Sequence, residues 1–345
     1  MAARTGVETR SVNIAGRQIG PGRPVFVIAE AGVAHFGSLD AACALVDMAV
    51  RAGADAVKFQ VFRTDRLISA ESPEWRARLR PKELPYSAFE EIKRYCDGRG
   101  ILFLATAHEE ESADFIETLG VPAYKIGSGE VENLPFYRHM AKKGKPLIVS
   151  TGLHELDAVG EIVEICKEAG NEDLILLHCN TAYPTPPGES QLLAMRVLSE
   201  RFHVPVGYSD HTIGINVTLA AAAFGAQIIE KHICLDKSVS DSQDCRVACD
   251  ETDLVSLVRG IREIEAAVGD GRKAISPSAR ASIGWARKSL VLKGNMKAGS
   301  VVKPDDLIAK RPGGGISPRE IQRVLGKRLR ANVRKDRLLR WEDLE

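Results

Sequence analysis

The chain has 345 residues, of which 44% are apolar and 27% charged, the composition of an ordinary soluble globular protein. It carries 47 Lys and Arg against 46 Asp and Glu, and this balance argues against a nucleic-acid-binding or membrane-binding surface over the whole chain. No apolar run reaches the ~18 residues of a membrane span, and the N-terminus lacks a signal-peptide core. Seven scattered cysteines predict reduced thiols in a cytoplasmic protein.

Eight short, mostly continuous apolar runs alternate with helix-like segments, as expected for strands covered on both faces. The runs are VFVIAEAG (25–32), AVKFQ (56–60), ILFLAT (101–106), AYKIGS (123–128), PLIVST (146–151), LILLHC (174–179), VPVGYSD (204–210) and AQIIEKHI (226–233). Eight β-then-α units over about 245 residues predict a (β/α)8 TIM barrel. A doubly wound open sheet is the alternative that this pattern leaves open.

The segments between the runs carry helix start and stop signals. Ser38 stands at an N-cap position, and Gly53 follows the same segment at its C-terminal end. Ser87 and Glu90 have the spacing of a capping box. Residues 250–268 supply the last long helix.

The length of the chain favours one large domain and one small domain. After Gly269 the alternation of apolar runs and helix-like segments stops. We predict a barrel domain at 1–269 and a Gly-, Ser- and Arg-rich linker at 270–283. Residues 284–345 combine short β-like pieces with turns, which predicts a small β-rich domain.

Polar residues follow the apolar runs at the point where each predicted strand ends. In a barrel the carboxyl ends of all strands meet on one face, where active sites are built. A ring of polar groups there is hard to explain by packing, because buried polar groups cost stability unless they are partnered. The residues concerned are Glu30, Lys58, Gln60, Thr106, Lys125, Ser128, Glu130, Ser150, His178, Asn180, Ser209, Asp210, His211, Glu230 and His232.

Two histidines, His211 and His232, end the seventh and eighth predicted strands. Neighbouring strand ends allow their imidazoles to converge on one divalent ion. Nitrogen ligands favour Mn, Fe, Co or Zn over Mg. The alternative is that each ring is a hydrogen-bonded core histidine.

Two lysines, Lys58 and Lys125, lie among hydroxyl side chains at other strand ends. Two ammonium groups in a dry pocket predict a site for a small phosphorylated or carboxylated anion. The alternative is that each lysine forms a salt bridge with Glu30, Glu130 or Glu230.

Several motifs in order resemble the sialic acid synthase family, which includes the N-acetylneuraminate, legionaminate and pseudaminate synthases. The C-terminal region resembles the antifreeze-like (SAF) domain of that family. The motifs are AEAGVAHFG (29–37), AGADAVKFQ (52–60), KIGSGEVENLP (125–135), GKPLIVSTG (144–152), LLHCNTAYPTP (176–186), VPVGYSDHTIG (204–214), GAQIIEKHICLDKS (225–238) and KRPGGGISP (310–318).

The resemblance implies a transferase that condenses phosphoenolpyruvate with an open-chain N-acyl hexosamine such as N-acetylmannosamine. The products would be a nine-carbon 2-keto sugar acid and phosphate, formed by C–O cleavage. It also implies a domain-swapped homodimer in which Arg311 reaches the sugar from the partner subunit. The metal, Mn²⁺ first and Mg²⁺ or Co²⁺ as alternatives, would be held by His211 and His232.

The remaining roles that the resemblance implies fall into two groups. Gln60, Glu130, Tyr183 and Asp244 would contact the sugar, and Glu30 would lie near the reacting carbons; Glu30 and Glu130 would take part in catalysis. Residues that would hold phosphoenolpyruvate are Lys58, Thr106, Lys125, Ser128, Ser150, Asn180 (or Thr181 in its place) and Ser209.

The sequence departs from the family pattern on the sugar side. Ala34 and Phe36 replace polar residues, Ala107 replaces a proline, the segment 68–87 is shorter, and Asp244 lies in a longer loop. These changes predict unchanged donor chemistry with an altered acceptor, less polar than N-acetylmannosamine. Two other functions stay open: a metal-dependent aldolase or hydrolase on the same barrel, and a non-catalytic sugar-binding homologue.

Overall fold

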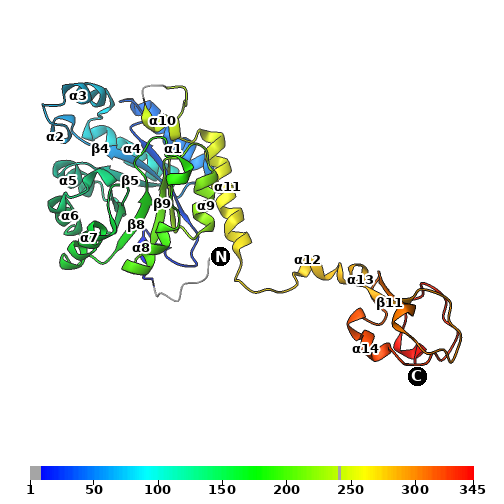
Figure 1. Cartoon of the computed structure of the whole chain (residues 1–345). Coiled ribbons are helices and arrows are strands. Elements are labelled where there is room, and N and C mark those ends of the chain that lie inside the picture. The colour runs from blue at the N-terminus through cyan, green and yellow to red at the C-terminus, as the bar shows by residue number, and fades with distance from the viewer. Residues whose placement is uncertain (1–8, 240–241) are drawn as a thin grey trace. The chain divides into compact units, whose positions relative to one another are not determined.

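Eight parallel strands close into a barrel (Figure 1) in the computed structural model of the chain, which describes residues 9–239 and 242–345. Each strand pairs with the next along the chain, and β10 closes the ring on β3. The closed ring confirms the predicted TIM barrel and excludes the open sheet. The strands are β3 (Phe26–Gly32), β4 (Ala56–Val61), β5 (Leu102–Ala107), β6 (Tyr124–Ile126), β7 (Leu147–Ser150), β8 (Leu174–Cys179), β9 (Val206–Asp210) and β10 (Ile228–His232).

One main helix follows each barrel strand and covers its outer face (Figure 1). These helices are α1 (Leu39–Ala52), α4 (Tyr86–Arg99), α5 (Glu110–Thr118), α6 (Leu134–Ala141), α7 (Leu156–Glu168), α8 (Ala194–Phe202), α9 (Asn216–Ala223) and α11 (Glu251–Val268). Shorter helical segments interrupt the loops at α2 (Thr64–Leu67), α3 (Pro73–Leu79), η1 (Arg80–Lys82), η2 (Ser128–Glu130), η3 (Pro187–Glu189) and α10 (Gln243–Val247).

The helix caps agree with the sequence in one case and differ in another. The Ser38 hydroxyl accepts a hydrogen bond from the Ala41 amide at 3.2 Å, and Gly53 ends α1 in the left-handed conformation at φ 76°. The predicted Ser87 capping box is wrong, because α4 begins directly after Pro85 without a side-chain cap. Pro85 is itself the N-cap residue, with ψ 155° in the extended region, so the helix has already begun when the chain reaches Ser87.

The inside of the barrel is filled by apolar side chains that point inward from the lower part of the strands. Phe26, Ile28, Leu104, Ile148, Ile175, Leu177 and Ile228 belong to this cluster. A short hairpin that the sequence did not indicate, β1 (Val12–Ile14) with β2 (Arg17–Ile19), adds Val12, Ile14 and Ile19 to the same cluster. The lower half of the barrel is therefore a packed core rather than a pore.

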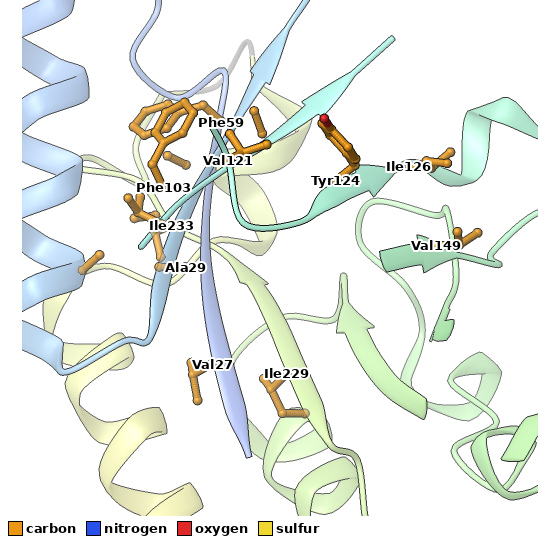
Figure 2. Close-up of a cluster of buried hydrophobic side chains, with 14 of the residues drawn as sticks. Val27, Ala29, Phe59, Phe103, Val121, Tyr124, Ile126, Val149, Ile229 and Ile233 are labelled. Carbon is orange, nitrogen blue, oxygen red and sulfur yellow. The ribbon is translucent and has the colours of Figure 1, made fainter. Parts of the chain in front are cut away.

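A second apolar layer lies between the strands and the helices. Figure 2 shows part of this layer, with Phe59, Phe103, Tyr124, Val149 and Ile229 among the side chains drawn. These residues alternate along the strands with the inward-facing set. Because both faces of each strand are buried, the strands read as continuous apolar runs in the sequence.

The chain divides into two compact units, one that ends at Gly271 and one that comprises Arg272–Glu345. The second unit has its own core, which includes Leu290, Leu292, Val324, Leu329 and Leu339. Its elements are α12 (Pro277–Arg280), α13 (Ile283–Ala286), β11 (Ser289–Leu292), η4 (Pro304–Asp306), β12 (Leu307–Lys310), η5 (Pro318–Glu320), α14 (Ile321–Val324) and η6 (Trp341–Asp343). The predicted linker, 270–283, thus contains the helical turn α12.

None of the helices in the described part of the chain has both the length and the apolar character needed to cross a bilayer.

Gly207 in β9 tests how tightly the barrel interior is packed. A Cβ at this position would lie 2.7 Å from Leu177 Cδ2 and 2.8 Å from Ile228 Cβ. We expect Gly207→Ala to lower the free energy of unfolding by at least about 2 kcal/mol, because overpacking a rigid core forces strain. Urea unfolding of Gly98→Ala, in α4 with nothing within 4 Å of the new methyl group, is the control and should show equal or higher stability. Equal stability of the two variants would contradict the packing described here.

Candidate active site

The upper end of the barrel interior is polar, and it follows the apolar interior by one step of two residues along the strands. Ile28 precedes Glu30, Leu104 precedes Thr106, and Ile148 precedes Ser150 in this way. Because alternate residues of a strand share one face, the polar residues point into the same space as the apolar cluster below them. Glu30, Thr106 and Ser150 of the predicted strand-end set therefore line the mouth of the barrel, whereas His178 and Asp210 of that set lie on the other face of their strands.

Lys58 on β4 lies at the centre of this polar layer. Its ammonium nitrogen is 2.7 Å from Glu30 Oε2 and 3.6 Å from Glu230 Oε2, and it donates to the Thr106 hydroxyl at 2.9 Å. Only 3% of the Lys58 side chain is exposed. The sequence left two interpretations of Lys58 open, a salt bridge with a glutamate and a contact with a bound anion. Lys58 forms the salt bridge, and it also faces the mouth of the barrel, as the second interpretation requires.

Lys125 on β6 is the second buried cation of the layer. It donates to the Ser150 hydroxyl at 2.7 Å and lies 3.7 Å from Glu230 Oε1. The Ser209 hydroxyl donates to the same Glu230 oxygen at 2.8 Å. Glu230 therefore bridges the two ammonium groups from one side.

The charges of this cluster shift the pKa values of its members. Burial works to raise the pKa of Glu230, but Lys125 and Lys58 outweigh it and lower that pKa to about 2. Burial works to lower the pKa of Lys58, and Glu230 with Glu30 reverses the shift and raises it. The pKa of Lys125 is lowered by burial, which its more distant carboxylate does not offset. An entering anion would have two ammonium groups to bind here.

The two predicted metal-binding histidines lie side by side at the ends of β9 and β10. Their ring centres are 5.4 Å apart, and both side chains are buried. His211 Nδ1 lies 2.5 Å from the carbonyl oxygen of Asn180, which assigns the ring proton to Nδ1. Nε2 of the same ring lies 2.9 Å from the Tyr183 hydroxyl.

This arrangement fits a metal site. A ligating imidazole commonly donates its other N–H to a backbone carbonyl, which fixes the tautomer and leaves one lone pair free. Burial, followed by the charge of His232, lowers the pKa of His211 to about 4, so the ring is neutral at pH 7. Within the described residues no group of three or more His, Cys, Asp or Glu side chains is placed to hold a metal, so the fit rests on the two imidazoles.

Glu130 occupies a separate position in the loop after β6. Its Oε2 accepts from the Asn133 side chain at 2.6 Å, and its Oε1 lies 4.0 Å from His108 Nδ1. Burial raises the pKa of this carboxyl despite the asparagine. A carboxyl with a raised pKa is suited to exchange a proton near neutral pH.

The other predicted site residues are distributed as follows. Gln60 Nε2 donates to Glu30 Oε1 at 3.1 Å, and Ser128 Oγ accepts from the Gly152 amide at 2.9 Å. Asp244 on α10 lies close enough to Tyr183 to raise its pKa, after the larger effect of burial. The side-chain oxygen of Asn180 accepts from the Ala182 amide. The contact of Asn180 with His211 is made by its backbone carbonyl oxygen.

One predicted residue lies in the other unit, and one altered loop is described only in part. Arg311 belongs to the C-terminal unit, where its Nε donates to the Ala286 carbonyl at 3.0 Å and its guanidinium lies over Trp285. The altered loop before Asp244 begins with Ser240 and Asp241, which lie outside the described residues.

Sequence reasoning missed two side chains that line this space. Cys179 Sγ lies 3.2 Å from Ser128 Oγ, whereas His178, the candidate at that strand end, contacts the Ser190 carbonyl instead. The alternation along β8 was the available signal, because Cys179 is two residues from the inward-facing Leu177. His108 follows β5 and faces Glu130; no spacing in the sequence links these two residues.

A closed (β/α)8 barrel with two buried lysines and a histidine pair at the carboxyl ends of its strands defines a barrel enzyme that handles a small anion. Comparison with known proteins assigns the family. The chain matches the NeuB family over residues 45–273 and the SAF domain over residues 287–345. It belongs to the NeuB family of sialic acid-type synthases, and the expected resemblance is confirmed.

Relatives match the chain over nearly its full length. It is 39% identical to N,N'-diacetyllegionaminic acid synthase of Campylobacter jejuni over 333 residues, covering 92% of this chain and 99% of the relative. Identity to the enzyme of the same name from Legionella pneumophila is 38% over 337 residues, covering 93% and 94%. A crystal structure of N-acetylneuraminic acid synthetase from Leptospira borgpetersenii, 31% identical, superposes with a TM-score of 0.75 over 80% of this chain and 95% of its own.

The depressed pKa of Glu230 predicts a pH-dependent contribution to stability. A carboxyl whose folded pKa lies below its unfolded value stabilises the fold above the unfolded pKa, and that contribution is lost as pH falls. The pKa of Glu230 falls from 4.5 to about 2 on folding. This shift contributes on the order of 3 kcal/mol to the free energy of unfolding at pH 7.

We therefore expect Glu230→Gln to be less stable than the wild type at pH 7, with the difference shrinking as pH falls below about 4.5. Urea unfolding at a series of pH values measures both free energies. A difference that stays constant down to pH 3 would show that the lysines do not hold this carboxylate ionised.

Proposed function

We propose that this chain is a metal-dependent synthase that joins phosphoenolpyruvate to an open-chain N-acylated aldose, releasing phosphate and a nine-carbon 2-keto sugar acid. The observation that supports the proposal is the buried pair of ammonium groups, Lys58 and Lys125, beside the His211–His232 pair. Phosphoenolpyruvate carries a phosphate and a carboxylate, and two separated cations in a dry site suit such a ligand.

The donor would bind by exchanging partners with the cluster. Its anionic groups would take the place of Glu30 beside the Lys58 ammonium, at 2.7 Å, and of Glu230 beside the Lys125 ammonium, at 3.7 Å. Hydroxyl groups of Thr106, Ser150 and Ser209 surround the same space, and the Ser128 hydroxyl and the Gly152 amide lie next to it. Asn180 would act through its backbone.

The acceptor would be held with its aldehyde near the imidazoles. His211 and His232 would hold the divalent ion, Mn²⁺ first, whose chemistry is Lewis-acid polarisation of a carbonyl oxygen. Tyr183, whose hydroxyl contacts His211, and Gln60, which donates to Glu30, would orient the sugar hydroxyls. Asp244 lies beside Tyr183 and would take part in the same contacts.

Two of the carboxylates at the site, Glu30 and Glu130, would take part in the chemical steps. C3 of the enol phosphate attacks the aldehyde carbon, and positive charge develops at C2, where Glu30 would stabilise it. Water adds at C2, and the tetrahedral intermediate expels phosphate with cleavage of the C–O bond. Glu130, whose carboxyl has a raised pKa, would accept one proton of that water, the alkoxide formed from the aldehyde takes up one proton in exchange, and the second proton of the water leaves with phosphate.

Replacing one imidazole tests the synthase function directly. We expect His211→Ala to reduce phosphate release from phosphoenolpyruvate and an N-acyl aldose by at least about 1,000-fold, because the electrophile is no longer activated. The assay measures inorganic phosphate with Mn²⁺ present. His139→Ala, on α6 where the ring pairs with Asp114, is the control and should keep wild-type turnover. Turnover by His211→Ala within tenfold of the wild type would contradict the proposal.

We further propose that the acceptor carries two acylamino groups. A product with two N-acetyl groups must take both from the aldose, because phosphoenolpyruvate contains no nitrogen, and the two legionaminic acid synthases above are named for such a product. The loop after β3 starts at the site, since a Cβ on Gly32 would lie 3.3 Å from Glu30 and 3.6 Å from His232. Ala34 and Phe36 make this loop less polar.

Phe36 adopts φ 48°, a conformation that costs free energy for a bulky side chain. The residue is 38% exposed, and Lys82 Nζ lies 5.5 Å from the ring centre. A strained aromatic residue in the loop that starts at the site fits a role in contacting the acyl groups of the acceptor.

We expect Phe36→Asn to lower kcat/KM for a diacetamido aldose relative to N-acetylmannosamine by about tenfold, the usual value of one lost apolar contact. The fold should not be weakened, because asparagine tolerates a positive φ. Trp75→Ala is the matched control, because Trp75 lies on α3 and is 58% exposed. N-acetylmannosamine as the best acceptor of the wild type, or an unchanged ratio in Phe36→Asn, would contradict this part of the proposal.

The proposed oligomer is a homodimer in which the C-terminal unit of one copy covers the barrel of the other. Residues 272–345 carry 19 Lys and Arg against 7 Asp and Glu, which leaves 28 against 39 for residues 1–271. Opposite net charges on the two units favour such docking between copies. Arg311 would then reach the acyl group of the sugar. The free thiols of all seven cysteines support the cytoplasm as the compartment.

A further inference from the structure

A buried ion pair lies behind the two histidines. Lys231 precedes His232 on β10, and Asp210 precedes His211 on β9, and the two residues are register partners in the sheet. Their charged groups are 2.7 Å apart, and neither side chain has any exposed surface. Because residues alternate along a strand, this pair faces the helix layer while the imidazoles face the barrel mouth.

The pair is part of a network that fixes the backbone on either side of His211. Asp210 Oδ2 accepts from Thr218 Oγ1 at 2.6 Å and from Thr212 Oγ1 at 3.0 Å, while Oδ1 accepts from the Thr212 amide at 3.0 Å. Lys231 Nζ also donates to the Thr212 carbonyl at 2.6 Å. Thr218 lies on α9, so the network joins two strands and the helix outside them.

Stability alone does not account for a charged pair at this position. Taking two charges out of water costs free energy that their attraction only partly returns, and apolar replacements of buried pairs are often as stable. Its hydrogen bonds are directional, and three of them end on Thr212, the residue directly after His211. What this geometry supplies is a fixed relation between the ends of β9 and β10.

We propose that Lys231 and Asp210 are positioning residues that hold His211 and His232 at the spacing required to share one divalent ion. The inference rests on the proposed metal-dependent function. The pair touches neither substrate nor metal; it acts through the backbone of the two strand ends. Residues outside the ligand set that orient metal ligands change metal affinity by about 10-fold to 100-fold when they are replaced.

The test compares Mn²⁺ affinity with stability in Lys231→Met and in the double variant Asp210→Asn/Lys231→Met. The single variant leaves a buried carboxylate without its cation, so both properties should fall. The double variant removes that unpaired charge, and its stability should recover toward the wild type. Its Mn²⁺ affinity should stay at least tenfold weaker, because the tie between the strand ends is still missing.

Electron paramagnetic resonance of free Mn²⁺ gives the affinity, and urea unfolding gives the stability. Asp55→Asn is the matched control: Asp55 pairs with Arg262 at 3.2 Å and accepts from the Val27 amide at 2.8 Å, at the other end of the barrel. It should lose stability while keeping wild-type Mn²⁺ affinity.

Wild-type Mn²⁺ affinity in the double variant, within twofold, would overturn the positioning role and leave the proposed function intact. A wild type that binds no Mn²⁺ would overturn both. If the lysine variants do not fold, Asp210→Asn keeps a side chain of the same size and removes the charge that pairs with Lys231. It should weaken Mn²⁺ binding at least about tenfold, and an unchanged affinity in that variant would overturn the inference.

Discussion

The contact between two buried ammonium groups and the carboxylate of Glu230 is the interaction on which the site depends. Lys58 and Lys125 lie where water hardly reaches, so charge interactions there are stronger than at a surface. Without an anion the cations need Glu230 and Glu30 as partners. When an anion is bound, it replaces these carboxylates as the partner of the two ammonium groups. The same two charges therefore stabilise the folded barrel mouth and bind the substrate.

The barrel below makes this cluster possible. The apolar interior, completed by Val12, Ile14 and Ile19 of the N-terminal hairpin, ends two residues before the polar layer. Charged side chains can thus be held on rigid strands with little exposure. The neighbouring strands β9 and β10 use their two faces differently: the inward face carries Ser209 and Glu230, and the outward face carries the Lys231–Asp210 pair.

The fold could be predicted from sequence because strands covered on both faces give unbroken apolar runs, and all eight runs correspond to strands. The side chains of Glu30, Lys58 and Lys125 could be assigned to the mouth of the barrel for the same reason, because each lies near the C-terminal end of one of these runs. The hairpin at residues 12–19 could not, because three-residue strands carry no periodicity. The inward position of Cys179 in place of His178 could have been predicted from the alternation along β8, because Cys179 is two residues after the inward-facing Leu177.

Contacts between distant loops lay beyond sequence reasoning. His108 meets Glu130 only because β5 and β6 are adjacent in the closed ring, and no spacing along the chain encodes a 4.0 Å approach. The ion pair of Lys231 with Asp210 is a similar case. Each residue directly precedes one of the two histidines in the sequence, but only the register of β9 and β10 shows that the two are partners.

A crystal structure with phosphoenolpyruvate and Mn²⁺ bound is the most direct measurement of the central claim. The account predicts that the ligand's anionic groups contact both Lys58 and Lys125, that these lysines move away from Glu30 and Glu230, and that the ion lies between His211 and His232. A ligand bound elsewhere, with both lysines still on their carboxylates, would contradict it.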